Sequence, residues 1–422
     1  MRWLGGADVR GMLRGPAGGG ASAVRRRRPS GPSQTAWSRK GARGMSIVAM
    51  KFGGTSVADA ERIRAAARRA IRTQKRGHQV VMVVSAMGKE TDRLVQLARE
   101  VSGEAEPPKR EMDQLLATGE QVTISLVAMA LEEMGVGAIS FTAGQIGLVT
   151  DAAHTKARIR RIDARRIHRE LDAGKIVIVA GFQGVTEEGA VTTLGRGGSN
   201  VTLVAVAAAL QADVCENYTD VDGVFTADPR LVPNARKLAR ISYDEMLELS
   251  SLGASVLHNR AVECAKKYEI PLHVRNSAHS RKGTMIVSET ESMERIVVSG
   301  AALKQDLARV TLRHVPDTPG VAARVFHALA RHNVMVDDII QTGGEVGGAT
   351  VSFTVELSEL AEAEGVVRRL CGELGCTETF ERDLAKVSVV GVGMRTHTGV
   401  AERMFEALAA AEINIQSITT SE

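Results

Sequence analysis

Aromatic residues make up only 3 % of this 422-residue chain, and cysteine occurs four times. The cysteines have neither the spacing of a metal site nor that of a disulfide framework; they are Cys215, Cys264, Cys371 and Cys376. No apolar run reaches the roughly 18 residues that a membrane-spanning helix needs. No segment has the apolar stretch of a secretory signal. These absences predict free thiols, no membrane-spanning segment and a cytoplasmic protein.

Acidic residues are nearly absent from residues 1–44, which contain ten Lys and Arg residues but only Asp8. That segment has a net charge of +9 and the whole chain has +5, so residues 45–422 sum to −4. A mildly acidic body does not favour nucleic-acid binding. Residues 1–44 lack an apolar period and are predicted to be disordered. Residues 1–44 fit either an organelle transit peptide or a wrongly assigned upstream start codon, with translation beginning at Met45. The wrongly assigned start codon is favoured because ordered sequence begins directly after Met45.

Two common nucleotide-binding patterns are also missing. The chain has no Gly-x-x-x-x-Gly-Lys-Ser/Thr motif, which excludes a P-loop kinase, and it lacks the motif set of protein kinases, which excludes that class as well. Residues 51–56 read Lys-Phe-Gly-Gly-Thr-Ser, between an apolar run and a segment with helical spacing. Gly53 and Gly54 let backbone N–H groups approach a ligand, and Lys51 and the helix start add positive charge. This favours a phosphate site; a plain strand–turn–helix joint with Ser56 as N-cap is the alternative.

Strand and helix signals alternate after this turn. Helices are predicted at 58–75, 91–101 and 108–134, the last interrupted at 118–120, and strands at 80–84, 138–141 and 176–180. The continuous apolar strands indicate a parallel sheet that is covered on both faces. The fold class is therefore doubly wound α/β. Its ligands are expected at the carboxyl ends of the strands, where Lys51, Ser85 and Gly181 lie.

Two further polar turns are candidate ligand sites. Residues 194–200 form a second glycine turn before a predicted helix at 201–211, and Arg196 within it suits a two-hydrogen-bond contact with a carboxylate. A glycine-rich hairpin with a solvated arginine is the alternative. Residues 218–230 carry three carboxylates and an arginine after a strand. A metal–nucleotide loop and a solvated loop with Asx turns both fit that pattern.

Together these motifs resemble those of the aspartate kinases, which belong to the amino-acid kinase superfamily. Five motifs occur in the order and approximate spacing of that family, at residues 51–56, 118–121, 195–199, 218–230 and 253–258. The resemblance spans residues 46–422. Residues 308–340 and 385–418 form an internal repeat of strand, turn, amphipathic helix and strand. This repeat resembles the paired ACT domains of aspartate kinases; a dimerisation module without a ligand is the alternative.

The resemblance implies a fold and a division into domains. The implied fold is a three-layer amino-acid kinase domain with a mainly parallel central sheet, followed by two α+β, ferredoxin-like ACT domains. The expected division is a leader at 1–44, a catalytic domain at 45–290, a first ACT region at 291–384 and a second ACT domain at 385–422. The second ACT domain stops after its second strand and is expected to be incomplete.

The resemblance also implies an activity and its residues. Phosphate from ATP, with Mg²⁺, is transferred to the side-chain carboxylate of L-aspartate, giving 4-phospho-L-aspartate, the first step of lysine, threonine and methionine biosynthesis. The expected catalytic residues are Lys51, Arg196 and Asp220. The expected aspartate contacts are Thr55, Ser85, Glu120, Arg196 and Ser199. The expected ATP contacts are Lys51, Gly53, Gly54, Thr55, Ser56, Thr219, Asp220, Phe225, Arg230, Ser255 and Val256. No separate metal site formed by side chains is expected.

The ACT repeat implies feedback regulation by lysine, threonine or both, and assembly as a homodimer or an α₂β₂ tetramer. Asp317, Gln341 and Asn414 are expected to line the effector pocket. Met293 resembles the internal start of a separate regulatory subunit in some family members, although an ordinary linker methionine is favoured.

Three residues depart from the family pattern. Asn200 stands where Asp is usual, Ser255 where many members have Lys, and Phe225 where Tyr is common. The changes at Asn200 and Ser255 remove charges near the phosphates. Together with the incomplete second ACT domain they motivate a second hypothesis, a non-catalytic amino-acid sensor or regulatory paralogue. The argument against that hypothesis is that four functional residues are intact: Lys51, Glu120, Arg196 and Asp220. A kinase acting on glutamate or acetylglutamate is disfavoured by the ACT repeat and the Thr-Gly-Glu-Gln motif.

Overall fold

The computed structural model describes residues 45–103, 105–252, 256–288, 298–332, 334–343, 348–391 and 399–420. The predictions made for residues 1–44, Ser255 and Met293 lie outside these ranges.

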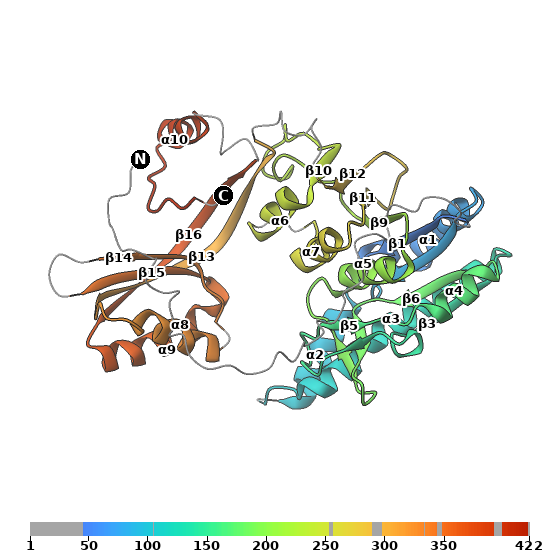
Figure 1. The fold of residues 1–422 in the computed structure, drawn as a ribbon, viewed down its shortest axis with the longest axis horizontal. Coiled ribbons are helices and arrows are strands. Elements are labelled where there is room, and N and C mark those ends of the chain that lie inside the picture. The colour runs from blue at the N-terminus through green and yellow to red at the C-terminus, as the bar shows by residue number, and fades with distance from the viewer. Residues whose placement is uncertain are drawn as a thin grey trace, which may run out of the picture. The chain divides into compact units, whose positions relative to one another are not determined.

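The N-terminal domain is built on an eight-stranded sheet in the order β10-β12-β11-β9-β1-β2-β6-β3 (Figure 1). Its strands are β1 (Ile47–Phe52), β2 (Gln79–Val84), β3 (Ala138–Phe141), β6 (Ile176–Ala180), β9 (Val214–Thr219), β10 (Arg240–Ser242), β11 (Leu272–Asn276) and β12 (Thr284–Val287). All neighbouring strands are parallel except β11 and β12. A smaller sheet has the order β5-β4-β7-β8, with β4 (Val149–Thr150), β5 (Ile159–Arg161), β7 (Gln183–Val185) and β8 (Val191–Thr193).

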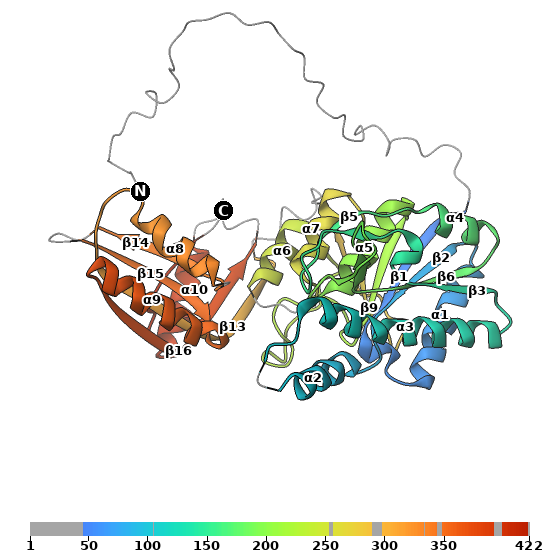
Figure 2. The ribbon, with the colours of Figure 1, turned by 90° about the horizontal axis from the view of Figure 1, so that it is seen from below.

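Helices cover both faces of the large sheet and complete the expected three layers. They are α1 (Ala60–Gln74), α2 (Glu90–Ser102), α3 (Lys109–Glu133), α4 (Arg165–Asp172), α5 (Gly198–Leu210), α6 (Tyr243–Ser251) and α7 (Asn259–Lys267), with a short 3₁₀ turn at Gly144–Ile146. α1 and α3 lie on one face and α4 and α5 on the other (Figure 2). Along β1, Met50 and Phe52 pack toward α1 and α3, whereas Ile47 and Ala49 pack toward α5. This alternation follows from the two-residue period of a strand.

α3 runs without a break from Lys109 to Glu133, so the predicted interruption at 118–120 is wrong. Gly119 instead lets α3 lie close to the loop after β2, because a Cβ at Gly119 would lie 2.8 Å from the Ala86 Cβ. Among the described residues α3 is the one helix long and apolar enough to cross a membrane by length and composition, and 44 % of its most apolar window is buried inside the protein. A core helix of a large domain has the same length and composition.

Two helices begin elsewhere than predicted. α1 begins at Ala60 with Asp59 as its N-cap, because the residues after the first glycine turn form a 3₁₀ turn, Gly54–Val57. α5 begins at Gly198, three residues earlier than predicted, with Gly197 as its N-cap at φ +71°. Only glycine adopts that backbone angle without strain. Arg196 therefore directly precedes the N-terminus of α5.

The C-terminal domain contains six main elements, and the first three are the strand, helix and strand predicted for the first copy of the repeat. They are β13 (Gly300–Val315), α8 (Val321–Arg331), β14 (Asp337–Thr342), β15 (Ala349–Glu356), α9 (Leu360–Leu374, after a 3₁₀ turn at Leu357–Glu359) and β16 (Thr377–Val390). The sheet is antiparallel in the order β14-β15-β13-β16, and both helices pack on it around Val310 and Phe353. β16 continues across the expected boundary between residues 384 and 385.

The second copy differs from its prediction. Its helix is present as α10 (Val400–Ala410), but the strand expected after it is not formed in the described residues 411–420. A strand needs a neighbouring strand for its backbone hydrogen bonds, and none of the described strands pairs with this segment. Ile413, Ile415 and Ile418 are consequently exposed.

Candidate functional site

The first glycine turn lies between the end of β9 and the loop after β2. The Gly53 N–H donates to the Tyr218 carbonyl oxygen at 3.2 Å, and the Gly88 N–H donates to the Gly54 carbonyl oxygen at 3.0 Å. A Cβ at Gly54 would lie 2.8 Å from the Ala86 carbonyl oxygen. Glycine is required there because the turn and the loop after β2 touch backbone to backbone.

Lys51 lies near the carboxyl end of β1, on the same side as Ala49 and therefore toward α5. Its residue is 8 % exposed. Burial lowers the pKa of its ammonium group to about 8, and the nearby Asp220 carboxylate opposes that shift. A Cβ at Gly53 would lie 3.3 Å from the Lys51 Nζ, so the ammonium group sits at the glycine turn. This is the arrangement expected for a cation that receives a phosphate.

Glu120 lies on α3 and is 2 % exposed. Its Oε1 accepts a hydrogen bond of 3.0 Å from the Ala86 N–H, whereas its buried Oε2 has no partner among the described residues. Burial raises the pKa of its carboxyl group to about 8. A buried carboxylate oxygen without a partner is costly, and an incoming ammonium group would supply the missing donor.

The second glycine turn presents Arg196 and Ser199 beside the strand ends. Arg196 is exposed, and no described acidic residue forms an ion pair with it. A Cβ at Gly181, directly after β6, would lie 2.7 Å from the Ser199 Oγ, so Ser199 packs on the end of the sheet. Asn200 has a buried Oδ1 without a partner among the described residues. This turn brings the Arg196 cation, the Ser199 hydroxyl and the Asn200 Oδ1, which has no partner among the described residues, to the edge where Lys51 lies.

The end of β9 and the loop after it hold four of the eleven predicted ATP contacts, Thr219, Asp220, Phe225 and Arg230. The Thr219 Oγ1 donates to the exposed Asp220 carboxylate at 3.1 Å. Arg230 is not free, because its Nε and Nη2 donate to the Asp228 carboxylate at 3.0 and 2.6 Å. Phe225 forms a single β-bridge with Lys237. Val256 is half-buried, and the neighbouring Ser255 lies outside the described residues.

Ser56 and Thr55 are placed differently from each other. Thr55 is exposed. The buried Ser56 donates its hydroxyl hydrogen to the Ser277 Oγ at 2.9 Å, so it joins the glycine turn to the loop after β11. Ser85 directly follows β2, and its N–H donates to the Phe52 carbonyl oxygen at 3.1 Å.

The loop after β11 was missed by the sequence reasoning. In it the Asn276 Nδ2 donates to the Asp222 Oδ1 at 2.7 Å, and the His279 Nε2 lies 2.8 Å from the same oxygen. These contacts hold the β9 and β11 loops together. The segment 276–279 shows no motif; its only signal is its place after a strand, since β11 turns out to neighbour β9.

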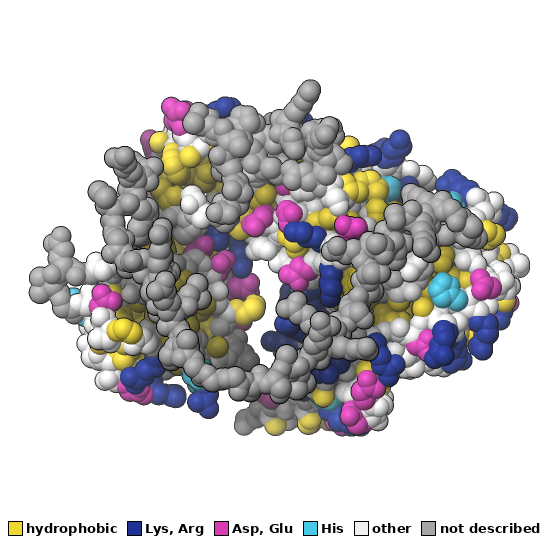
Figure 3. Space-filling model, viewed as in Figure 1, with side chains coloured by type: hydrophobic (Ala, Val, Ile, Leu, Met, Phe, Trp, Pro, Cys, Tyr) yellow, Lys and Arg dark blue, Asp and Glu magenta, His cyan; other side chains and the backbone are white. Residues whose placement is uncertain are grey.

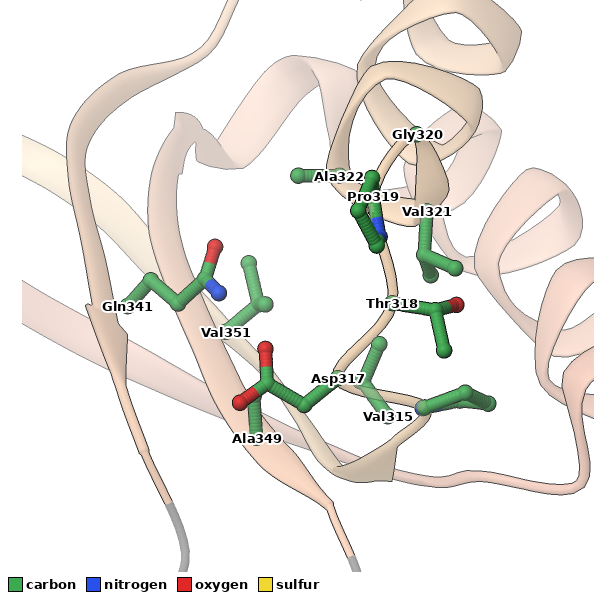
Figure 4. Close-up of a pocket in the computed structure, with 11 residues that line it drawn as sticks. Val315, Asp317, Thr318, Pro319, Gly320, Val321, Ala322, Gln341, Ala349 and Val351 are labelled. Atoms are coloured by element: carbon green, nitrogen blue, oxygen red, sulfur yellow. The ribbon is translucent and has the colours of Figure 1, made fainter.

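The predicted effector residues divide into two groups. Asp317 and Gln341 both line a pocket of about 450 Å³ between the loop after β13 and strands β14 and β15. Figure 4 shows both side chains at the same cavity, with the helix start at Pro319 and Gly320 above them. Asn414 is not among the lining residues, because the strand expected to carry it is not formed.

Comparisons with known proteins agree with this architecture. The Amino acid kinase family model matches residues 46–276, and ACT domain models match residues 310–374 and 387–422. An aspartate kinase of Stutzerimonas stutzeri is 51 % identical over 90 % of this chain and 92 % of its own length.

Solved structures agree as well. The crystal structure of E. coli aspartokinase III in complex with aspartate and ADP is similar with a TM-score of 0.76 and 27 % identity, covering 89 % of this chain and 94 % of that one. The same enzyme in complex with lysine and aspartate gives a TM-score of 0.68 and 27 % identity, over 89 % of this chain and 93 % of that one.

Proposed function

The chain belongs to the aspartate kinases, and from this premise we infer that its N-terminal domain transfers the terminal phosphoryl group of ATP to the side-chain carboxylate of L-aspartate. The reaction gives 4-phospho-L-aspartate and opens the biosynthesis of lysine, threonine and methionine. One observation carries the assignment of the site: Lys51 on β1 with a lowered pKa, Glu120 on α3 with a buried oxygen that has no partner among the described residues, and the exposed Arg196 before α5 all lie toward the carboxyl edge of the sheet.

Aspartate has an ammonium group and two carboxylates, and the site offers a partner for each of the groups that do not react. Glu120 receives the ammonium at its Oε2, which has no partner among the described residues. Arg196 receives the α-carboxylate with two parallel hydrogen bonds. Ser85, Thr55 and Ser199 supply hydroxyl groups near the reacting carboxylate. That carboxylate is already ionised at neutral pH, so the site needs no general base.

ATP approaches the two glycine turns and the loop after β9. Lys51 neutralises charge on the transferred phosphoryl group, and the backbone N–H groups near Gly53 and Gly54 add hydrogen bonds. Thr219, Asp220, Phe225, Arg230, Ser255 and Val256 line the nucleotide side. Mg²⁺ bound to ATP is usually held by phosphates and one or two carboxylates. The exposed Asp220 near Lys51 fits that role.

The C-terminal domain serves regulation. Lysine, threonine or both bind the pocket beside Asp317, where the carboxylate takes the effector's ammonium and the N–H groups at the start of α8 take its carboxylate. E. coli aspartokinase III, 27 % identical, was crystallised with lysine and aspartate, which supports an amino-acid effector. Assembly as a homodimer or an α₂β₂ tetramer would complete the second ACT unit through Asn414 and the exposed residues after α10.

The amino-acid composition supports a cytoplasmic location and argues against nucleic acid or a membrane as a partner. Basic and acidic side chains are interspersed over the described residues on the face shown in Figure 3, in keeping with the net charge of −4 that the sequence gives residues 45–422. Such a surface suits neither nucleic acid nor an anionic membrane.

A hydroxamate assay with ATP, Mg²⁺ and a panel of acidic amino acids tests the proposal. Product is expected with L-aspartate and not with glutamate or acetylglutamate, and it is expected to disappear in Lys51→Ala. A protein that binds lysine or threonine but forms no product with any acceptor would instead be the non-catalytic sensor that Asn200 and Ser255 suggest.

A further inference from the structure

Asp113 is a fully buried carboxylate on α3 that takes no part in the site described above. Its relative exposure is 0 %. Its Oδ2 lies 2.7 Å from the His154 Nδ1, its Oδ1 accepts from the Thr193 Oγ1 at 2.5 Å, and both oxygens accept from the Thr155 N–H at 3.0 Å. A carboxylate with this many donors holds all of them in place, because losing any one would leave a buried polar group unpaired.

These donors belong to two segments, residues 154–155 and the end of β8. Both segments support the second glycine turn, residues 194–200, which is called the Arg196 turn below. Thr193 is the last residue of β8, and Gly195 follows two positions later. Thr155 has a φ of +68°, which is strained for a β-branched residue. Its carbonyl oxygen would lie 2.9 Å from a Cβ at Gly195. Asp113 thus holds a strained residue directly against the turn that carries Arg196.

Arg260, on α7, ties the same two segments together from the other side. Its Nη1 donates to the Leu194 carbonyl oxygen at 2.6 Å, and its Nη2 donates to the Ala157 carbonyl oxygen at 2.9 Å. The Ala157 N–H in turn donates to the Thr193 carbonyl oxygen at 3.0 Å. The carbonyl groups of Thr193 and Leu194 are therefore both held by hydrogen bonds, and the turn that follows has little freedom.

Asp113 and Glu120 are seven residues apart on the unbroken helix α3, which is two turns and one face. We propose that Asp113 is a positioning residue for aspartate: through Thr155 and Thr193 it sets the place of Arg196 relative to Glu120. One rigid helix would then hold both the group that receives the ammonium and the support of the group that receives the α-carboxylate. The site thereby selects substrates that carry these two groups on one carbon. The inference rests on the proposed role of Arg196.

The test compares Michaelis constants for aspartate and ATP in Asp113→Asn and Thr193→Val. Each substitution keeps the side-chain shape and removes part of the hydrogen bonding. The KM for aspartate is expected to rise about tenfold in Asp113→Asn and less in Thr193→Val, with the KM for ATP and kcat within about twofold of wild type. Glu170→Gln is the matched control, since Glu170 is a buried carboxylate that bonds to Lys175 and Arg169, away from the Arg196 turn.

Two results would overturn the inference. Equal changes in the two Michaelis constants, or a change as large in Glu170→Gln, would make Asp113 a general structural residue. Thr193→Val keeps the test open if Asp113→Asn does not fold, and an unchanged KM for aspartate in that variant would count against the proposal.

Arg196→Ala separates this inference from the proposed function. If Arg196→Ala leaves the KM for aspartate unchanged, the proposed role of Arg196 fails and the inference fails with it. If Arg196→Ala raises that KM and Asp113→Asn does not, only the inference fails. The expected result is that Asp113→Asn adds nothing in the Arg196→Ala background, because the two residues act through one contact.

Discussion

Glu120→Gln tests the ammonium site through its pH dependence. Burial raises the pKa of the Glu120 carboxyl group to about 8 in the free protein, and only the ionised form can pair with the ammonium of aspartate. Wild-type enzyme should therefore bind aspartate more tightly as the pH rises toward 8 and level off above it. In Glu120→Gln the KM for aspartate should be high and independent of pH over the same range.

The magnitude follows from the fraction of Glu120 that is ionised. With a pKa of about 8, roughly 1 % is ionised at pH 6 and half at pH 8, so the KM for aspartate should fall roughly fiftyfold between these values. At pH 7, binding should release about 0.9 proton, which calorimetry in buffers of different ionisation enthalpy would measure. A KM for aspartate that stays constant from pH 6 to 8 in the wild type would refute the reasoning.

The same shift predicts an effect on stability. The folded-state pKa of about 8 lies above the ordinary value of 4.5, so ionising Glu120 destabilises the free protein: the penalty is absent below pH 4.5, grows as the pH rises and is complete above 8. The shift corresponds to about 5 kcal/mol. Glu120→Gln should therefore unfold at higher denaturant concentration than wild type at pH 9, and near pH 4 the two should be alike. A variant less stable than wild type at pH 9 would contradict this.

Four further substitutions have definite expected outcomes. Lys51→Met should reduce phosphoryl transfer several hundredfold, as expected from losing one electrostatic contact of roughly 3–4 kcal/mol. It should also raise the free energy of unfolding at pH 7 by about 3 kcal/mol, because the folded-state pKa of Lys51 is about 8, below the ordinary value of 10.5. The cost of burying the charged ammonium group is present below pH 8 and is lost as the pH rises to 10.5. If activity falls less than tenfold, Lys51 does not belong to the site. Asn200→Asp should increase activity or lower the Mg²⁺ concentration required, and unchanged kinetics over a Mg²⁺ series would show that the loop already compensates. Asp317→Asn should relieve inhibition by lysine and threonine while uninhibited activity stays intact; if neither amino acid inhibits the wild type or the variant, the pocket assignment is wrong. Gly119→Ala should lower thermal stability by about 1–3 kcal/mol through overpacking against Ala86, 2.8 Å from the new Cβ, whereas a gain in stability would mean that helix propensity outweighs the contact.

Much of the molecule was evident from local pattern. The apolar runs at 80–84 and 176–180 became buried central strands because a parallel sheet covered on both faces tolerates only apolar residues. The glycine turn at 51–56 and the repeat in the C-terminal third were equally visible, since each depends on residues close together in the chain. The first strand, the helix and the second strand of the first repeat copy were predicted from apolar periodicity, and they are β13, α8 and β14.

Predictions from local pattern were wrong where the local structure depends on a contact between residues far apart in the chain. Gly119 suggested a helix break, but its function is to approach Ala86, and α3 continues through it. Residues 411–420 have the composition of a strand, yet a strand is not formed without a neighbouring strand in the described residues.

Short-range periodicity and the backbone angles that glycine alone adopts freely are enough to predict the class of fold and the two glycine turns. The residue types that the chemistry needs can likewise be read from local sequence. Which of these side chains already have hydrogen-bond or ion-pair partners depends on the tertiary structure. It pairs Ser56 with Ser277, 221 residues away, and Arg230 with Asp228. It buries Glu120 against Ala86 and leaves its Oε2 without a partner among the described residues. It also surrounds Asp113 with donors from residues 154, 155 and 193. Charge, pKa and hydrogen-bond satisfaction depend on what surrounds a group in space, and only the packed chain supplies those surroundings.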